Sequence, residues 1–369
     1  MEKNKKIKIL FLLTSISQPR CIKRVKSFIK AGFDVKIYGF DRGSYNENAN
    51  IEGHEIVVLG KQKNGTGYFS KLIQSYKTLN YIIRVEGTNN TLFYCFGYMM
   101  ALFVMLKKLP YIYEISDILY EKKKFKYIKW FIRKVDRTLV KSSVLTVMTS
   151  KGFKDHLFGA KQLNNVIIQP NRIDSSFTNK SRPSIKEFDI NHLSFAFVGA
   201  IRFNTIFNVA ETIGKYHTNH QFHFFGESNL SHKAIELTKQ YSNIVYHGSF
   251  KNPDDLTDIY DSIDIVVSCY DIRSIGVKIA EPNKLYESMY FYKPIIVSEN
   301  SFLSEQVERY GTGFSINPYD ENKINNFISS LNEKIINEKV ENIKNVAIEE
   351  IIDDDGEKII SFIKKNYSL

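Results

Sequence analysis

The sequence predicts an α/β protein made of two doubly wound domains, and three observations support this fold class. The chain has 369 residues, more than the roughly 250 residues at which a single hydrophobic core usually stops growing. Short apolar runs alternate with segments of helical periodicity, and this alternation starts afresh after Pro183. The polar, proline-bounded stretch at 170–183 has the composition of a hinge.

The first half begins with KIKILFLLT, an apolar β run, followed by apolar residues at helical spacing up to Gly32. A second strand in DVKIYGF completes a βαβ unit, the building block of parallel Rossmann-like sheets. Further strands are expected in the segments EIVVLG, TLFYCF, PYIYEI, VLTVMT and NVIIQP. We place the first domain at 1–180.

The second half carries near-continuous apolar strands, which are typical of a parallel sheet covered on both faces. These strands are expected in SFAFVGA, QFHFFG, NIVYHG, DIVVSC and PIIVSE. We place this domain at 186–345, and the segment 346–369 is predicted to form a helix that crosses back onto the first domain. The predicted fold therefore has two Rossmann-like domains with an interdomain cleft, where ligands bind at the carboxyl ends of the strands.

Cysteine usage and apolar runs indicate a cytoplasmic protein. Cys21, Cys95 and Cys269 lie far apart, which argues against both a disulfide framework and a zinc site. The N-terminal apolar run is too short for a signal peptide. The run at 92–106 has about 15 residues, fewer than the roughly 20 needed to cross a bilayer, and is interpreted as a strand, a turn at Gly97 and a buried helix.

The two halves carry opposite charge. Residues 1–185 contain about 33 Lys and Arg against about 13 Asp and Glu, whereas the whole chain has a formal net charge of +11. The remainder is therefore acidic, by roughly nine charges. We expect the two halves to face different partners.

A basic segment from Lys122 to Arg137 is interleaved with aromatic residues. It contains Lys122, Lys123, Lys124, Phe125, Lys126, Tyr127, Lys129, Trp130, Phe131, Arg133, Lys134 and Arg137. Lysine-rich helices with an aromatic flank adsorb to anionic membranes, where each basic residue near the surface contributes about 1 kcal/mol. We interpret the segment as a membrane-facing helix. The alternative is a solvated helix that buries its aromatic residues in the core.

The most specific stretch is EPNKLYE at 281–287. Proline at a helix start, with Asn283 and Lys284 in the first turn, is typical of a helix end that binds a diphosphate. Glu287 would lie on the same helix face as Asn283 and could accept hydrogen bonds from two ribose hydroxyls. The alternative is that Lys284 and Glu287 are solvated charges on an ordinary surface helix.

This stretch and its surroundings resemble glycosyltransferase family 4, the "group 1" enzymes of bacterial capsule, exopolysaccharide and O-antigen synthesis, and specifically their PNKLYE-type branch. NVIIQPNRID resembles the family's segment near the hinge, and SFAFVGAIR resembles the first strand and phosphate loop of the donor domain. NIVYHGSF, DIYDSIDIVVS and PNKLYESMYFYKPIIVS follow in the family's order. The resemblance covers most of the second half and implies the GT-B fold, with the acceptor bound by the first domain and the nucleotide sugar by the second.

The resemblance also implies donor-site residues. Glu287 resembles the second glutamate of the family's E-x7-E motif, which holds the donor ribose. Gly199 and Arg202 resemble the glycine and the basic residue beside the diphosphate, and Ser249 and Phe250 resemble the segment that meets the base.

Two departures from the family pattern shift roles to other residues. The first glutamate of the motif would fall at Ile279, which cannot bind sugar hydroxyls, so Glu281 is the candidate in its place. The lysine usual after the phosphate loop is missing near Asn204, and Lys284 is the candidate replacement. Arg202 and Lys284, with the helix start at Asn283, would stabilise the negative charge that develops on the leaving diphosphate.

No DxD-like metal box stands in a predicted strand-end loop, and Asp353-Asp354-Asp355 is interpreted as a solvated turn. We therefore expect no metal cofactor, with the nucleotide-diphosphate sugar as co-substrate. The resemblance implies retention of anomeric configuration, in which the acceptor attacks on the face of the leaving group.

In the first domain, the loops after strands suggest acceptor contacts. Asp117 follows the strand PYIYEI and is the candidate contact or proton partner, with Glu114 as the second candidate. The alternative for Asp117 is a cap on the next helix. Ser17 and Arg20 lie after the first strand, where Arg20 could bind a phosphate.

Together these observations predict a metal-independent glycosyltransferase that extends a lipid-linked glycan at the inner face of the membrane. Two alternatives remain at this point. One is a sugar-nucleotide epimerase of the same fold, which should need carboxylates and histidines in the cleft. The other is a non-catalytic nucleic-acid-binding protein that uses the basic half, although no RNA- or DNA-binding motif accompanies the charge.

Overall fold

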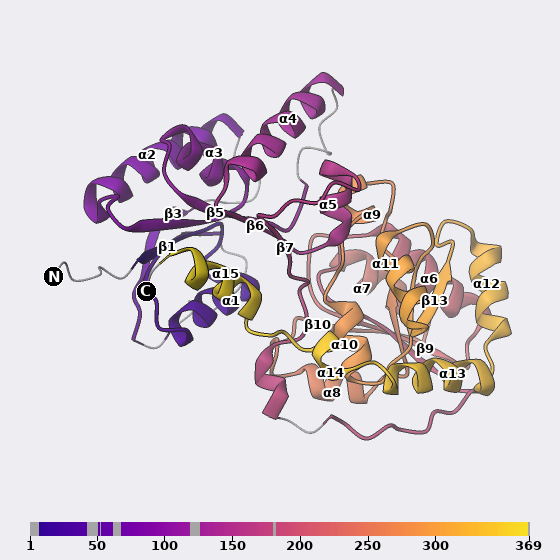
Figure 1. Cartoon of the computed structure of the whole chain (residues 1–369). Coiled ribbons are helices and arrows are strands. Elements are labelled where there is room, and N and C mark those ends of the chain that lie inside the picture. The colour runs from indigo at the N-terminus through magenta and orange to yellow at the C-terminus, as the bar shows by residue number, and fades with distance from the viewer. Residues whose placement is uncertain are drawn as a thin grey trace. The chain divides into compact units, whose positions relative to one another are not determined.

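The structure, a computed structural model, describes residues 7–42, 51, 53–61, 68–118, 126–179 and 182–367. The chain divides into two compact units (Figure 1). The first consists of Met1–Asn171 with Asp354–Leu369, and the second of Arg172–Asp353. The acceptor and donor roles assigned to the two predicted domains remain predictions.

The first unit contains a parallel sheet with strand order β3-β2-β1-β4-β5-β6-β7. Its strands are β1 (Lys8–Leu13), β2 (Asp34–Asp41), β3 (Ile56–Lys61), β4 (Thr91–Phe96), β5 (Tyr111–Ile115), β6 (Leu145–Met148) and β7 (Val166–Ile168). Its helices are α1 (Pro19–Lys30), α2 (Tyr68–Glu86), α3 (Tyr98–Leu106), α4 (Lys126–Ser142), α5 (Lys151–Phe158) and α15 (Glu357–Asn366). All seven strands correspond to predicted apolar segments.

Helices cover both faces of this sheet. α1 and α15 lie on one face and α2, α3 and α4 on the other (Figure 1). Phe11 of β1 packs edge-on against Phe28 of α1, with ring centroids 5.4 Å apart. Ile359 and Ile363 of α15 are fully buried in the same core. The predicted return of the C-terminal helix to the first domain is therefore confirmed.

The apolar run at 92–106 folds as predicted, with β4, a turn at Gly97 and α3. Gly97 has φ +90°, a left-handed conformation that favours glycine, and α3 starts at the next residue. Among the described residues, no helix is both long and apolar enough to cross a membrane.

The second unit contains a parallel sheet with strand order β10-β9-β8-β11-β12-β13. Its strands are β8 (Ser194–Val198), β9 (Gln221–Phe225), β10 (Ile244–Gly248), β11 (Ile265–Ser268), β12 (Ile295–Ser298) and β13 (Gly313–Ile316). Its helices are the 3-10 helix η2 (Ser175–Asn179) and α6 (Asn204–Tyr216), α7 (Ser231–Gln240), α8 (Leu256–Asp261), α9 (Ile275–Lys278), α10 (Lys284–Tyr290), α11 (Phe302–Tyr310), α12 (Glu321–Ser330), α13 (Glu333–Lys344) and α14 (Ile348–Ile351).

Alternation along β8 explains why both faces of the second sheet are covered. Phe195 and Phe197 enter one core cluster, and Ala196 and Val198 enter the other. Sequence patterning did not identify β13, because this four-residue edge strand starts at a glycine and three of its residues are only partly buried.

Candidate functional site

Three neighbouring strands of the second sheet meet glycines at their carboxyl ends, the edge where open α/β sheets bind ligands. The amide of Gly199 donates to the Phe225 carbonyl at 2.8 Å, and the amide of Gly226 donates to the Gly248 carbonyl at 2.6 Å. A β-carbon on Gly226 would lie 1.9 Å from the carbonyl oxygen of Gly199. Only glycine therefore allows the loops after β8 and β9 to approach this closely.

Lys284 and Glu287 are buried beside this edge, in the first turn of α10. Their exposed fractions are 5% and 2%, and the Lys284 ammonium donates to Glu287 Oε2. A β-carbon on Gly199 would lie 3.5 Å from Lys284 Cε, so the lysine passes next to the loop after β8. The alternative that these residues are solvated surface charges is therefore wrong.

The cations at this edge are the side chains of Lys284, which is paired with Glu287, and of Arg202, and the helix end adds little. α10 has only seven residues, so few peptide dipoles add up along it. A buried ammonium close to Gly199 is a stronger attraction for a diphosphate.

Three side chains hold the Glu287 carboxylate. Asn283 Nδ2 donates to Oε1, whereas Lys284 Nζ and Tyr260 Oη donate to Oε2, the tyrosine at 2.8 Å. A carboxylate has about four acceptor positions, so about one remains on Oε1. Asn283 is the half-buried member of the set, and a ribose hydroxyl could reach Oε1 once this amide turns away.

Glu281 lies apart from this group. Its carboxylate accepts a hydrogen bond from Tyr286, and burial raises its pKa above the usual range. Arg172 lies over the same tyrosine ring, 6.0 Å from the centroid. Among the described residues, no hydrogen bond connects Glu281 with the group around Glu287. A sugar contact for Glu281 remains a prediction.

The remaining donor candidates lie in the loops of the same edge. Arg202 is exposed in the loop between β8 and α6, where its guanidinium is accessible to a ligand. Ser249 is exposed directly after β10, and Phe250 is half-buried against the core. Their positions fit the predicted contacts to the diphosphate and the base, which remain predictions.

In the first unit, the structure brings Arg20 and Glu114 together. Arg20 Nε lies 3.2 Å from Glu114 Oε1, Arg24 Nε donates to Oε2 at 3.4 Å, and Tyr94 Oη donates to Oε2 at 2.5 Å. Glu114 is 1% exposed. A buried carboxylate enclosed by two guanidinium groups and a phenol has little access to a substrate, which favours a positioning role for Glu114.

Asp117 and Ser17 occupy strand-end loops of the same sheet. Asp117 is exposed two residues after β5, and Ser17 Oγ lies 3.3 Å from Ser15 Oγ after β1. Residues 119–125 lie outside the described ranges, so the capping alternative for Asp117 remains a prediction, as does its acceptor role.

The described part of the basic segment lies in α4, whereas Lys122, Lys123, Lys124 and Phe125 lie outside the described residues. Tyr127, Trp130 and Phe131 are 67%, 64% and 61% exposed. Their spacing places them on one stripe of the helix, and Lys134 on that stripe lies with its Nζ 5.4 Å from the Trp130 ring centroid. The alternative that these aromatic residues are buried in the core is therefore wrong.

Two basic residues of the segment serve a different purpose. Arg133 donates to the carbonyl of His156, and Arg137 donates to the carbonyl of Leu157, both in the last turn of α5. These guanidinium groups satisfy carbonyls that a helix end leaves unpaired. The exposed basic charge of α4 therefore comes mainly from its lysines.

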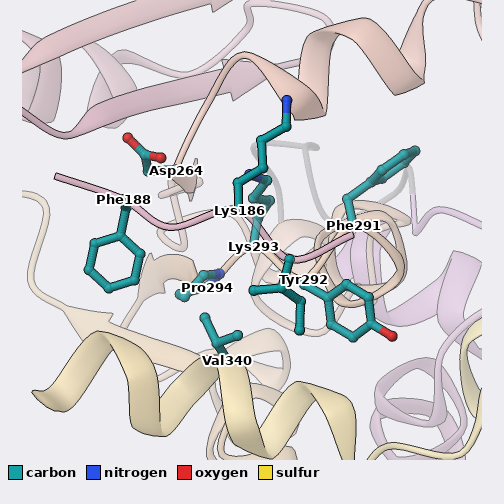
Figure 2. Close-up of a pocket in the computed structure, with 9 residues that line it drawn as sticks. Lys186, Phe188, Asp264, Phe291, Tyr292, Lys293, Pro294 and Val340 are labelled. Atoms are coloured by element: carbon teal, nitrogen blue, oxygen red, sulfur yellow. The ribbon is translucent and has the colours of Figure 1, made fainter. Parts of the chain in front are cut away.

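A small pocket lies at the opposite edge of the second sheet (Figure 2). Asp264 directly precedes β11, and Lys293 and Pro294 precede β12, so these lining residues lie at the amino ends of the strands. The pocket has room for about one water molecule. It is therefore separate from the donor site.

Within the described part of the chain, no group of three or more His, Cys, Asp or Glu residues could hold a metal ion.

Comparison with solved structures shows the fold. A glycosyltransferase from Rickettsia africae ESF-5 is 13% identical with a TM-score of 0.69, and covers 99% of this chain and 100% of its own. Anabaena Alr3699/HepE, in complex with UDP and glucose, is 14% identical with a TM-score of 0.67 and coverages of 98% and 100%. WaaG, described as a glycosyltransferase involved in lipopolysaccharide biosynthesis, is 13% identical with a TM-score of 0.68 and coverages of 96% and 99%.

These similarities and the two parallel sheets define a protein with the GT-B fold, as the sequence predicted. Residues 192–349, most of the second unit, match the family model "Glycosyl transferases group 1". No curated protein sequence matches the chain. The chain is a glycosyltransferase, an enzyme that transfers a sugar from a nucleotide sugar, and its second unit is similar to the group 1 enzymes over the matched residues. This assignment decides against the epimerase and the non-catalytic nucleic-acid-binding protein.

Sequence reasoning missed two residues of the site, Gly226 and Tyr260. Tyr260 stands 27 positions before its acceptor Glu287, and helical or strand periodicity does not reveal such a distant pair. The available signal was a tyrosine at a core position of a predicted helix, because a buried phenol hydroxyl usually has a hydrogen-bond partner.

Proposed function

We propose that this enzyme transfers a sugar from a nucleoside-diphosphate donor to a lipid-linked glycan at the cytoplasmic face of the membrane, in surface polysaccharide synthesis. Transfer retains the anomeric configuration and needs no metal ion. The observation that carries the proposal is the buried Lys284 beside Gly199, at the edge of the sheet that matches the group 1 family model.

The donor occupies the carboxyl edge of the second sheet. Its diphosphate lies between Gly199 and the cations Lys284 and Arg202, its ribose bonds to Glu287, and its base meets the loop at 249–250. Breaking the anomeric bond leaves negative charge on the nucleoside diphosphate, and preorganised cations lower the energy of that transition state. Catalytic rate therefore depends on Lys284 and Arg202 in this proposal.

The acceptor binds to the first unit. Asp117, exposed after β5, contacts the attacking hydroxyl, and Arg20 in the first turn of α1 binds a phosphate of the lipid carrier. Glu114 and Arg24 hold Arg20 in place through the buried ion-pair cluster. In this arrangement Asp117→Asn slows transfer while leaving donor binding unchanged.

The solved structures support a uridine nucleotide as the first donor to test. Alr3699/HepE is described in complexes with UDP and with UDP-glucose, and S. aureus MnaA in a complex with UDP. WaaG, which acts in lipopolysaccharide biosynthesis, supports a surface-glycan acceptor.

A thermal-shift panel of UDP-, GDP-, CMP- and dTDP-sugars tests the donor proposal. A ligand that binds only the folded chain raises its melting temperature by an amount that grows with affinity. One member should stabilise the wild type, and Arg202→Gln should reduce that stabilisation. Arg309→Gln, which changes another exposed arginine of the same unit, is the matched control. A panel in which no member raises the melting temperature would contradict the proposal.

We also propose that α4 binds the anionic membrane surface. The stripe formed by Tyr127, Trp130, Phe131 and Lys134 presents aromatic rings beside positive charge, and amphipathic helices use this combination at the lipid interface. Membrane binding would give these exposed rings a function, because it would remove their apolar surface from water.

Vesicle sedimentation tests this surface. Lys126, Lys134 and Lys141 changed to Gln should weaken binding to phosphatidylglycerol vesicles by about a hundredfold, since each charge contributes about 1 kcal/mol. Trp130→Ser with Phe131→Ser should weaken binding to the same vesicles. The control removes three exposed lysines of the second unit, Lys239, Lys323 and Lys334. Equal binding of all variants would exclude α4 as the membrane surface.

A further inference from the structure

We infer that Tyr260 is a positioning residue of the donor site, which fixes Glu287 and, through it, the ammonium of Lys284. This inference rests on the proposed function, because it assigns to Lys284 the contact with the donor's diphosphate. Tyr260 itself touches neither the donor nor the acceptor in this arrangement.

The ring of Tyr260 is locked in place. Tyr260 lies in α8 and is fully buried, and its ring stacks on Phe291 with centroids 4.6 Å apart and planes 14° apart. Phe291 is the residue that ends α10, the helix that carries Lys284 and Glu287. The stacking therefore fixes the phenol relative to the same helix whose carboxylate it contacts.

The hydroxyl completes a chain of hydrogen bonds. Tyr260 Oη donates to Glu287 Oε2 at 2.8 Å, and the same oxygen accepts from Lys284 Nζ. Burial and the adjacent carboxylate raise the pKa of Tyr260 far above its usual range, so the phenol remains a donor at physiological pH. Without this bond Oε2 would lose one of its two donors, and only Lys284 and the half-buried Asn283 amide would hold the carboxylate, so the ammonium would be held less firmly.

A shift of the Lys284 ammonium would affect diphosphate binding, because the site leaves this group little room. Lys284 is 5% exposed, and its stem lies against the position of Gly199, where the diphosphate is proposed to bind. An ammonium has three donors, and Glu287 takes one of them, which leaves two to point at phosphate oxygens. Their direction depends on where Glu287 Oε2 lies, and Tyr260 sets that position.

A purely structural role for the hydroxyl is the competing explanation, and the chain offers a matched control. Tyr290 is 2% exposed, belongs to the same hydrophobic cluster, and donates its hydroxyl to the Phe177 carbonyl at 3.4 Å. Tyr290→Phe therefore removes a buried phenol hydroxyl from this core without touching Glu287.

The test measures UDP affinity by calorimetry on the full-length chain, with GDP as the probe if the wild type does not bind UDP. Tyr260→Phe should weaken binding about tenfold, because hydrogen bonds to charged groups are stronger than neutral ones. Tyr290→Phe should bind like the wild type. In a Glu287→Gln background, adding Tyr260→Phe should cost clearly less than tenfold, since coupled residues are not additive.

Three results would overturn the inference. Tyr260→Phe could bind UDP as tightly as the wild type, Tyr290→Phe could weaken binding equally, or the tenfold loss could persist unchanged in the Glu287→Gln background. If Glu287→Gln does not unfold cooperatively, the comparison of Tyr260→Phe with Tyr290→Phe decides alone. If no member of the thermal-shift panel stabilises the wild type, the proposed function itself fails, whereas the three results above overturn this inference alone.

Discussion

Asp136 gives the sharpest stability prediction for the first unit. It lies in α4 on the side that faces the sheet, is 3% exposed, and accepts a hydrogen bond from Tyr113 Oη of β5 at 2.8 Å. Burial raises its pKa from 3.8 to about 7, although the tyrosine bond opposes the shift. The folded state therefore binds more protons than the unfolded state between about pH 4 and pH 7, and the free energy of unfolding falls as pH rises through this range.

Asp136→Asn removes this titration and keeps an oxygen that can accept from Tyr113. With 1.36 kcal/mol per pKa unit, the shifted titration of Asp136 lowers the free energy of unfolding by about 1.5 kcal/mol at pH 5, where only the unfolded state is ionised, and by about 4 kcal/mol at pH 8. The free energy of unfolding of Asp136→Asn, relative to that of the wild type, should therefore increase by about 2.5 kcal/mol between these pH values. The buried amide adds an offset that does not depend on pH, so the change with pH is decisive.

Urea unfolding followed by circular dichroism measures this difference, because α4 and the other helices of the unit lose their signal on unfolding. Asp34→Asn changes an exposed carboxylate of the same unit and is the matched control. A constant difference between Asp136→Asn and the wild type from pH 5 to pH 8 would refute the reasoning.

Three further predictions concern the second unit and the reaction. Glu287→Ala leaves Lys284 buried without a counter-ion and should lower the free energy of unfolding by about 3–5 kcal/mol. The double variant Glu287→Met with Lys284→Met should restore most of this free energy. Urea unfolding followed by circular dichroism compares the two variants with the wild type. Gly226→Ala should prevent cooperative folding of the second unit, because its β-carbon would lie 1.9 Å from the Gly199 carbonyl oxygen. The control Gly248→Ala should still melt cooperatively, because a β-carbon there has no atom within 4 Å. EDTA should leave the initial rate of nucleoside-diphosphate release unchanged, and a rate that only added manganese restores would show that a metal is required.

Much of the fold could be predicted because its cause is local. Apolar runs such as TLFYCF must be buried, and their alternation with helical patterns permits few topologies. The return of α15 could also be predicted, since Ile359 and Ile363 recur at helical spacing and need a core. Strand β13 could not be predicted, because only one of its four residues is buried and its sequence has no strong apolar pattern.

The candidate site was predicted less completely. The motif at 281–287 identified Lys284 and Glu287 as site residues and placed Glu287 on the same helix face as Asn283, because residues four apart on a helix lie next to each other. Whether Lys284 and Glu287 were buried or solvated depended on α8 and the loop after β8, which are distant in sequence. The burial of Glu114 also could not be predicted, because its partners Arg20, Arg24 and Tyr94 come from two other elements.

By itself the sequence determined the fold class and indicated the side chains that could meet a diphosphate, since periodicity and motif spacing act over a few residues. Only the tertiary structure decided that Lys284 is buried, that Tyr260 holds Glu287, and that the aromatic residues of α4 face solvent. Burial and charge pairing depend on which distant elements come together, and no short-range pattern records that.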